Sequence, residues 1–125
     1  MKRLVLESWL LLFHFEWVMR FESFDALHRA VREEPVQPAS RSHIVPTEDL
    51  CQAVDMACVF YFKRVLCLQR SAATTVLLRR YGWNAQMVIG AQLLPFQSHA
   101  WVEVDDRVVN DKPYVTKIFQ VMERC

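Results

Sequence analysis

Apolar positions dominate the first third of the chain at helical spacing. Residues 2–20 are apolar almost all round, interrupted by only a few charged or polar side chains, which predicts a long helix. A shorter helix is expected over Phe24–Glu33, with Ser23 or Asp25 as its cap. Prolines and serines then punctuate residues 35–46, which indicates a linker.

Two further helices are predicted before the pattern changes. Thr47 is expected to cap the third helix, which runs to about Phe62. A fourth helix is expected to begin at Cys67 and to end at Gly82, because glycine readily takes the left-handed conformation that terminates many helices.

The last third of the chain has the pattern of strands. Ala85–Gln92 is apolar on both faces in its middle, which is typical of a central strand, and residues 93–97 are expected to form a loop. Ser98–Val104 and Arg107–Asp111 predict a second and a third strand, while residues 114–125 fit either a strand or a helix. Helices followed by a small antiparallel sheet indicate an α+β fold.

Length and composition favour one compact domain that is not built for nucleic acid. The 125 residues divide into an N-terminal helical region and linker, 1–46, and a core, 47–125. The net charge is only +1 and the basic residues are scattered, whereas a nucleic-acid interface needs a basic stripe. Two glycines are too few for a phosphate-binding loop, so no nucleotide cofactor is expected.

The four cysteines contain no CxxC pair, which matches neither a disulfide scaffold nor a structural zinc site. We therefore expect reduced thiols in the cytoplasm, with no bound metal or cofactor. Glu7 and Glu16 interrupt the first apolar segment, which argues against a membrane span. That helix offers a docking surface for a partner or for peripheral contact with a membrane, and core packing is an equal alternative.

A thiol, an imidazole and a carboxylate follow one another on three predicted elements: Cys67, His99 and Asp111. In a cysteine acyl-transfer site the sulfur attacks, the histidine moves the proton and the carboxylate orients the imidazole ring. At a helix N-terminus, free amides and the helix dipole favour the thiolate and can stabilise an oxyanion. Each residue alone is more often structural, so the hypothesis depends on their combination.

The turn between the last two strands decides whether the histidine and the carboxylate can meet. A two-residue turn at Asp105-Asp106 would pair Ala100 with Asp111 and leave His99 on the other face. A three-residue loop would pair His99 with Asp111 directly and would place Asp106 at positive φ. A bulge elsewhere could also restore the register.

Arg70, Ser71 and Trp101 are candidates for contact with a substrate. Arg70 and Ser71 lie one helical turn beyond the cysteine, although an ordinary solvated helix face is an equal alternative. Trp101 shares the face of the histidine and either shields the site or packs in the core. Glu103, on the same face, needs a cationic partner, for which Arg70 or Arg107 is available.

Six short motifs occur together between about residues 47 and 116: Cys67-Leu-Gln-Arg-Ser71, Leu77-Leu-Arg-Arg-Tyr-Gly82, Val88-Ile-Gly90, Pro95-Phe96, His99-Ala-Trp-Val-Glu103 and Val109-Asn-Asp111. In these motifs the chain resembles the leader peptidases of lasso-peptide biosynthesis. Those enzymes are the transglutaminase-like cysteine peptidase portion of the maturation protein called B. The resemblance implies a transglutaminase-like, papain-like fold, with Cys67 as nucleophile, His99 as general base and acid, and Asp111 as the orienting carboxylate.

The resemblance also implies a substrate and partners. The family cuts the leader from a ribosomally made precursor, typically after a leader whose next-to-last residue is threonine, and a separate cyclase then closes the macrolactam. A leader-binding protein (a RiPP recognition element) is either separate or fused ahead of the peptidase, and this chain resembles the stand-alone peptidase. It departs from the family at Asp105-Asp106, where Asp-Gly is common, a cost of about 1 kcal/mol for the turn.

Two other functions are compatible with the same residues. An acyltransferase would pass the thioester to an amine instead of to water, since the acylation step is identical. A non-enzymatic scaffold on the same fold would organise the precursor, the leader-binding protein and the cyclase.

Overall fold

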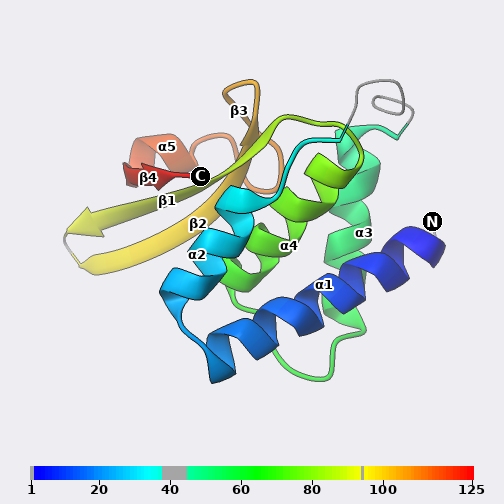
Figure 1. The fold of residues 1–125 in the computed structure, drawn as a ribbon. Helices are drawn as coiled ribbons and strands as arrows, with labels where there is room; N and C mark the ends of the chain where they lie inside the picture. The colour runs from blue at the N-terminus through cyan, green and yellow to red at the C-terminus, as the bar shows by residue number, and fades with distance from the viewer. Residues whose placement is uncertain (1, 38–44, 94) are drawn as a thin grey trace.

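Helices occupy the first part of the chain and a sheet follows, as Figure 1 shows for the computed structural model. The structure describes residues 2–37, 45–93 and 95–125. The helices of the first part are α1 (Lys2–Phe21), α2 (Phe24–Glu33), α3 (Thr47–Val59) and α4 (Cys67–Arg80). They are followed by β1 (Ala85–Leu93), β2 (Phe96–Val104), β3 (Arg107–Val108), α5 (Val115–Ile118) and β4 (Gln120–Arg124). The predicted α+β class is confirmed.

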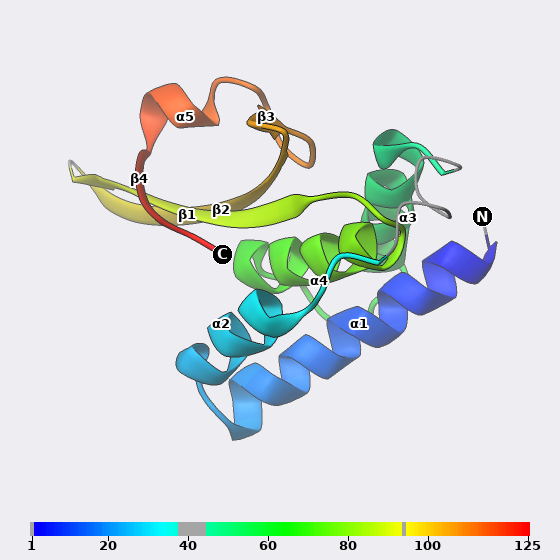
Figure 2. The same ribbon diagram turned by 45° about the horizontal axis from the view of Figure 1, so that its top comes forward.

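The elements are stacked in layers around α4 (Figure 2). The sheet has the strand order β3-β2-β1-β4 and every neighbouring pair is antiparallel. One face of the sheet lies on α4, whose other sides contact α1, α2 and α3, and α5 lies over the opposite face of the sheet. Helices α1 and α2 share one apolar core with α3, α4 and the strands β1 and β2.

Helix α4 is buried along most of its length, since every residue from Ser71 to Arg79 is buried. Alanine, serine and threonine side chains let the neighbouring elements approach its backbone closely. Their hydroxyls are satisfied locally, because Thr74 donates to the carbonyl of Arg70 and Thr75 to that of Ser71, both at 2.8 Å. The helix can therefore be buried on all sides at little polar cost.

The buried Arg79 joins α4 to two neighbouring elements. Its Nε donates to the carbonyl of Ala85 at the start of β1, at 2.9 Å, and its Nη1 donates to the carbonyl of Val31 near the end of α2. Burial lowers the pKa of this guanidinium. Two backbone carbonyls thus replace the water that a charged side chain would otherwise require.

The helix ends agree with most of the sequence expectations. Ser23 caps α2, because its hydroxyl accepts the backbone N–H of Ala26 at 3.1 Å. The third helix differs from its prediction at both ends. Its N-cap is Pro46 instead of Thr47, and it ends at Val59 instead of near Phe62. Helix α4 ends as predicted: Gly82 has a φ of 92° and donates its N–H to the carbonyl of Arg79.

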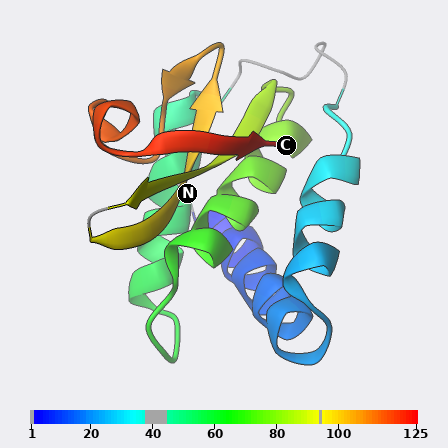
Figure 3. The same ribbon diagram turned by 90° about the vertical axis from the view of Figure 1, so that its left-hand side faces the viewer.

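The strands differ from the expectation in three places. The third strand, predicted over Arg107–Asp111, spans only Arg107–Val108 as β3. Leu93 pairs with Phe96, so β1 and β2 extend into most of the segment expected to be a loop, residues 93–97, of which residue 94 lies outside the described residues. The C-terminal segment, which fitted either a strand or a helix, contains both α5 and β4. Strand β4 lies alongside β1 and makes β1 a central strand, as its apolar pattern predicted (Figure 3).

The first helix has two different apolar faces. Leu11, Leu12, Phe15 and Val18 are buried in the core, whereas the opposite face remains exposed. Within the described residues, no helix contains a segment apolar enough to cross a membrane.

Gly90 of β1 lies against the indole of Trp101, which predicts that Gly90→Ala destabilises the fold. A Cβ at this position would lie 2.7 Å from an indole carbon of Trp101 and 2.9 Å from the Cβ of Phe119. The expected loss in the free energy of unfolding is about 1–3 kcal/mol, measured by urea denaturation. The matched control, Gln86→Ala at an exposed position of the same strand, should change stability by less than about 0.5 kcal/mol. Equal stability of the two variants would contradict the packing argument.

Candidate active site

Cys67 is the first residue of α4 and its side chain is half-buried. The residue before it, Leu66, is the N-cap and provides no side-chain hydrogen bond to the helix. The amides of the first turn are therefore not capped by that side chain, and the positive end of the helix dipole lies at the thiol.

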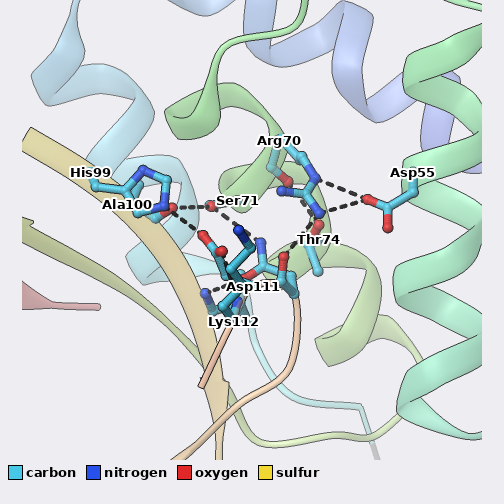
Figure 4. Close-up of polar contacts among 10 residues, drawn as sticks. Asp55, Arg70, Ser71, Thr74, His99, Ala100, Asp111 and Lys112 are labelled. Carbon is cyan, nitrogen blue, oxygen red and sulfur yellow. Dashed lines mark hydrogen bonds and ion pairs between the residues drawn. The ribbon is translucent and has the colours of Figure 1, made fainter. Parts of the chain in front are cut away.

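His99 lies on β2 and contacts Asp111, as Figure 4 shows. The Nε2 of His99 is 2.5 Å from Oδ2 of Asp111, and the two side chains are 26% and 19% exposed. The other carboxylate oxygen of Asp111 accepts the backbone N–H of Lys112 at 2.7 Å. The imidazole is thus held through one ring nitrogen, which leaves Nδ1 as the nitrogen for proton transfer.

The turn between β2 and β3 is one residue shorter than the loop that would pair His99 directly with Asp111. Val104 pairs with Arg107, so Asp105 and Asp106 form a two-residue turn with φ values of 51° and 64°. The prediction of positive φ at Asp106 is confirmed, but the three-residue loop is wrong. A regular ladder in this register would place Asp111 opposite Ala100.

Asn110, which the sequence analysis did not single out as a site residue, resolves this conflict. Strand β3 ends at Val108, and the Oδ1 of Asn110 accepts the backbone N–H of Val102 at 2.7 Å. The side-chain oxygen thereby substitutes for a backbone carbonyl of a regular ladder, which frees the main chain to turn. Asp111 can then reach His99 despite the tight turn.

Arg70 and Ser71 of α4 hold this segment in place (Figure 4). Ser71 donates to the carbonyl of Ala100 at 3.0 Å, and the Nδ2 of Asn110 donates to the Ser71 hydroxyl at 3.3 Å. The guanidinium of Arg70 donates to the carbonyl of Asn110 at 2.9 Å and forms an ion pair with Asp55 of α3. Ser71 is only 1% exposed, so the expectation that it contacts a substrate is corrected to an anchoring role. Arg70 is partly exposed.

Trp101 is fully buried and supports the histidine from within the fold. Its ring centroid is 6.1 Å from that of His99, and Phe119, which follows α5, lies 5.2 Å from His99. The core alternative for Trp101 therefore applies, in place of substrate contact. The indole Nε1 donates to Glu103 at 2.9 Å, and the partner of Glu103 is Arg124 of β4 instead of Arg70 or Arg107.

The thiol is not engaged with the imidazole. Within the described part of the chain, the Sγ of Cys67 makes no hydrogen bond, whether to His99 or to another group. Ser71, one helical turn further along α4, contacts β2 at Ala100, the residue after His99. The structure therefore brings His99 and Asp111 together and ties the neighbouring strand residue to α4 through Ser71, but it shows no hydrogen bond between the sulfur and the imidazole.

The other three thiols are packed in the structure. Burial raises the pKa of Cys51 to about 12, and it also raises the pKa values of Cys58 and Cys125. Cys51 belongs to the core and the other two pack against it. Among the described residues, no group of three or more His, Cys, Asp or Glu side chains is placed to hold a metal ion.

Comparison with known proteins gives a matching superfamily and one protein that is similar over part of the chain. The profile described as the transglutaminase-like superfamily matches residues 9–124. The microcin J25-processing protein McjB of Escherichia coli is 45% identical over 47 residues, which are 38% of this chain and 23% of that protein. The similar region therefore spans less than a quarter of the length of this relative. No solved structure matches.

Asn110→Ala is expected to remove the hydrogen bond that joins the segment after β3 to Val102 of β2. The N–H of Val102 would lose its acceptor inside the protein, at a cost of about 1–3 kcal/mol in the free energy of unfolding. Hydrogen exchange measured by NMR should be faster at the Val102 amide in this variant. Asn84→Ala, at an exposed asparagine, is the control and should leave that exchange unchanged. Unchanged protection in Asn110→Ala would contradict the role assigned to this side chain.

Alkylation is expected to select Cys67. The raised pKa values keep the three packed thiols protonated near neutral pH, and thiols react as thiolates. Iodoacetamide followed by peptide mapping should modify Cys67 first, and Cys67→Ala should remove the fast phase. Faster labelling of Cys51 than of Cys67 would show that burial does not control thiol reactivity in this protein.

Proposed function

Because this chain belongs to the transglutaminase-like superfamily, we propose that it is a cysteine peptidase that removes the leader from a ribosomally made lasso-peptide precursor. The observation that carries this proposal is the contact of 2.5 Å between His99 and Asp111, next to the helix that begins at Cys67. A carboxylate that holds one nitrogen of an imidazole is one part of the arrangement that cysteine acyl transfer needs, and the other part is a thiol such as that of Cys67 at a helix N-terminus.

In the proposed reaction, His99 takes the proton of the Cys67 thiol, and the resulting thiolate attacks the carbonyl carbon of the scissile peptide bond. The backbone N–H of Cys67 is a candidate donor to the developing oxyanion, since it lies at the start of α4. His99 then gives its proton to the leaving amine, and a thioester remains on the sulfur. Water, deprotonated by His99, attacks the thioester and restores the thiol. Asp111 keeps the ring oriented in both steps.

The partial similarity to McjB supports a proposed substrate and proposed partners. That protein is a microcin J25-processing protein, and the similar region covers 38% of this chain. We infer that the substrate is a precursor peptide with a leader, and that a separate leader-binding protein and a macrolactam cyclase act with this chain. No role is assigned to nucleic acid, because the net charge of the chain is only +1.

One observation favours a different function. The Sγ of Cys67 makes no hydrogen bond to His99 among the described residues, as expected for a scaffold or for a site that closes only when the peptide and its partner bind. For the peptidase, the sulfur of Cys67 and the imidazole of His99 would have to come within hydrogen-bonding distance when the substrate binds. An acyltransferase differs from the peptidase only in the group that accepts the acyl chain.

The peptidase proposal predicts cleavage that depends on Cys67. The substrates are a pool of synthetic peptides with threonine next to last in the leader, analysed by mass spectrometry in reducing buffer. Cys67→Ala should lower the rate of cleavage at least about 10³-fold, and Asp111→Ala about 10²- to 10⁴-fold. Cys58→Ala, which changes another half-buried thiol, is the matched control and should retain cleavage.

The products separate the three functions. Hydrolysed peptide alone supports the peptidase, whereas peptide joined to an added primary amine supports the acyltransferase. Equal cleavage by Cys67→Ala and by the wild-type chain would contradict the proposal.

A further inference from the structure

Five large apolar side chains form an exposed ridge along α1. They are Leu6, Leu10, Phe13, Trp17 and Phe21, each between 44% and 61% exposed. Their spacing of three or four residues places them on one side of the helix, opposite the face buried in the core. We call this surface the α1 ridge. An uninterrupted apolar surface of this kind is uncommon on a protein without a binding partner.

The exposed charged side chains of α1 itself are of one sign. The exposed charged residues of α1 are Lys2, Arg3 and Arg20, all of them basic. On a helical projection at about 100° per residue they flank the ridge on both sides. The acidic side chains of the helix are not free, because Glu7 contacts Tyr81 and Arg80, and Glu16 contacts Tyr61 and Lys63. Exposed acidic residues begin only beyond the end of the helix, at Glu22.

The segment between α3 and α4 extends the α1 ridge. Phe62 is 64% exposed and lines a hollow of about 200 Å³ together with Phe13, Trp17 and Phe21, and with the charged Arg20 and Glu16, of which Glu16 is paired with Lys63. Lys63 and Arg64 follow it and are also exposed. The apolar surface with its basic border is therefore built from two parts of the chain.

The α1 ridge faces away from the candidate active site. Helix α1 lies at the outer edge of the molecule, with α4 between it and the sheet (Figure 2). His99 and Asp111 belong to the sheet side of α4. A large flat body could cover the ridge without obstructing those two side chains.

We propose that the α1 ridge is a docking surface for an anionic lipid bilayer. Aromatic and aliphatic side chains enter the boundary between headgroups and acyl chains, and long basic side chains beside them reach the phosphates. Charge complementarity favours this occupant, because basic residues border the ridge and the acidic side chains of the helix are paired. The protein lies on the membrane surface, since no described helix can cross it. This inference does not depend on the proposed peptidase activity.

The test is co-sedimentation of the whole chain with vesicles. Vesicles of phosphatidylcholine and phosphatidylglycerol should bind the wild-type protein, and binding should weaken with added salt and with pure phosphatidylcholine. The double variant Phe13→Ser/Trp17→Ser should bind at least about tenfold more weakly. Arg20→Gln should weaken binding about fivefold, the equivalent of about 1 kcal/mol.

A matched control separates the α1 ridge from general hydrophobicity. Phe96→Ser removes an equally large side chain that is 72% exposed on the β1–β2 hairpin, and it should leave vesicle binding unchanged. Circular dichroism and thermal unfolding confirm that each variant is folded, and the folded Arg20→Gln variant tests the proposal if the double variant unfolds.

Three results would overturn the proposal. The first is no binding of the wild-type protein to anionic vesicles. The second is equal binding of the ridge variants and the wild type. The third is a concentration-dependent dimer in sedimentation velocity that Phe13→Ser/Trp17→Ser abolishes, which would assign the surface to a second copy of the chain.

Discussion

The burial of α4 is the constraint on which the rest of the structure depends. A helix that is covered by other helices and by a sheet must satisfy its polar groups inside the protein. The hydroxyls of Thr74 and Thr75 do so within the helix, while Ser71 and Arg79 form bonds to neighbouring elements. These outward bonds fix the position of α2 and of the sheet relative to the helix, and with them the surroundings of Cys67.

The candidate site arises where this helix meets the edge of the sheet. The tight turn at Asp105-Asp106 sets a register that by itself separates Asp111 from His99. Asn110 ends the ladder by bonding to Val102 with its side chain, and Ser71 and Arg70 hold Asn110 from α4. The imidazole–carboxylate pair therefore depends on the same helix that carries the thiol. Helix α4 thus carries the thiol and also anchors the segment that holds the imidazole–carboxylate pair, although no hydrogen bond joins the sulfur of Cys67 to the imidazole.

The two faces of α1 show how one apolar segment can serve two purposes. Leu12 and Phe15 complete the core against the other helices, which accounts for one side of this nearly all-round apolar helix. Trp17 and Phe21 on the opposite side have no role in that core. Because the acidic residues Glu7 and Glu16 form bonds to neighbouring elements, the outward face has a basic and aromatic character that the sequence does not display directly.

Local physics along the chain determined much of the fold. Ser23 caps its helix, Gly82 ends α4 with a positive φ, and the continuous apolar pattern of β1 identified a central strand. The order of Cys67, His99 and Asp111 on one helix start and one hairpin was also evident from the sequence. These features depend on a few neighbouring residues, so a linear sequence is sufficient to predict them.

Tertiary structure alone decided the features that join distant segments. It buried Ser71 and Trp101, which the sequence offered as substrate contacts, and it paired Glu103 with Arg124 instead of Arg70 or Arg107. It also gave Asn110 the bond to Val102 that brings Asp111 to His99. The free energy of each of these contacts depends on burial and on a partner far along the chain, and neither is encoded in a local pattern.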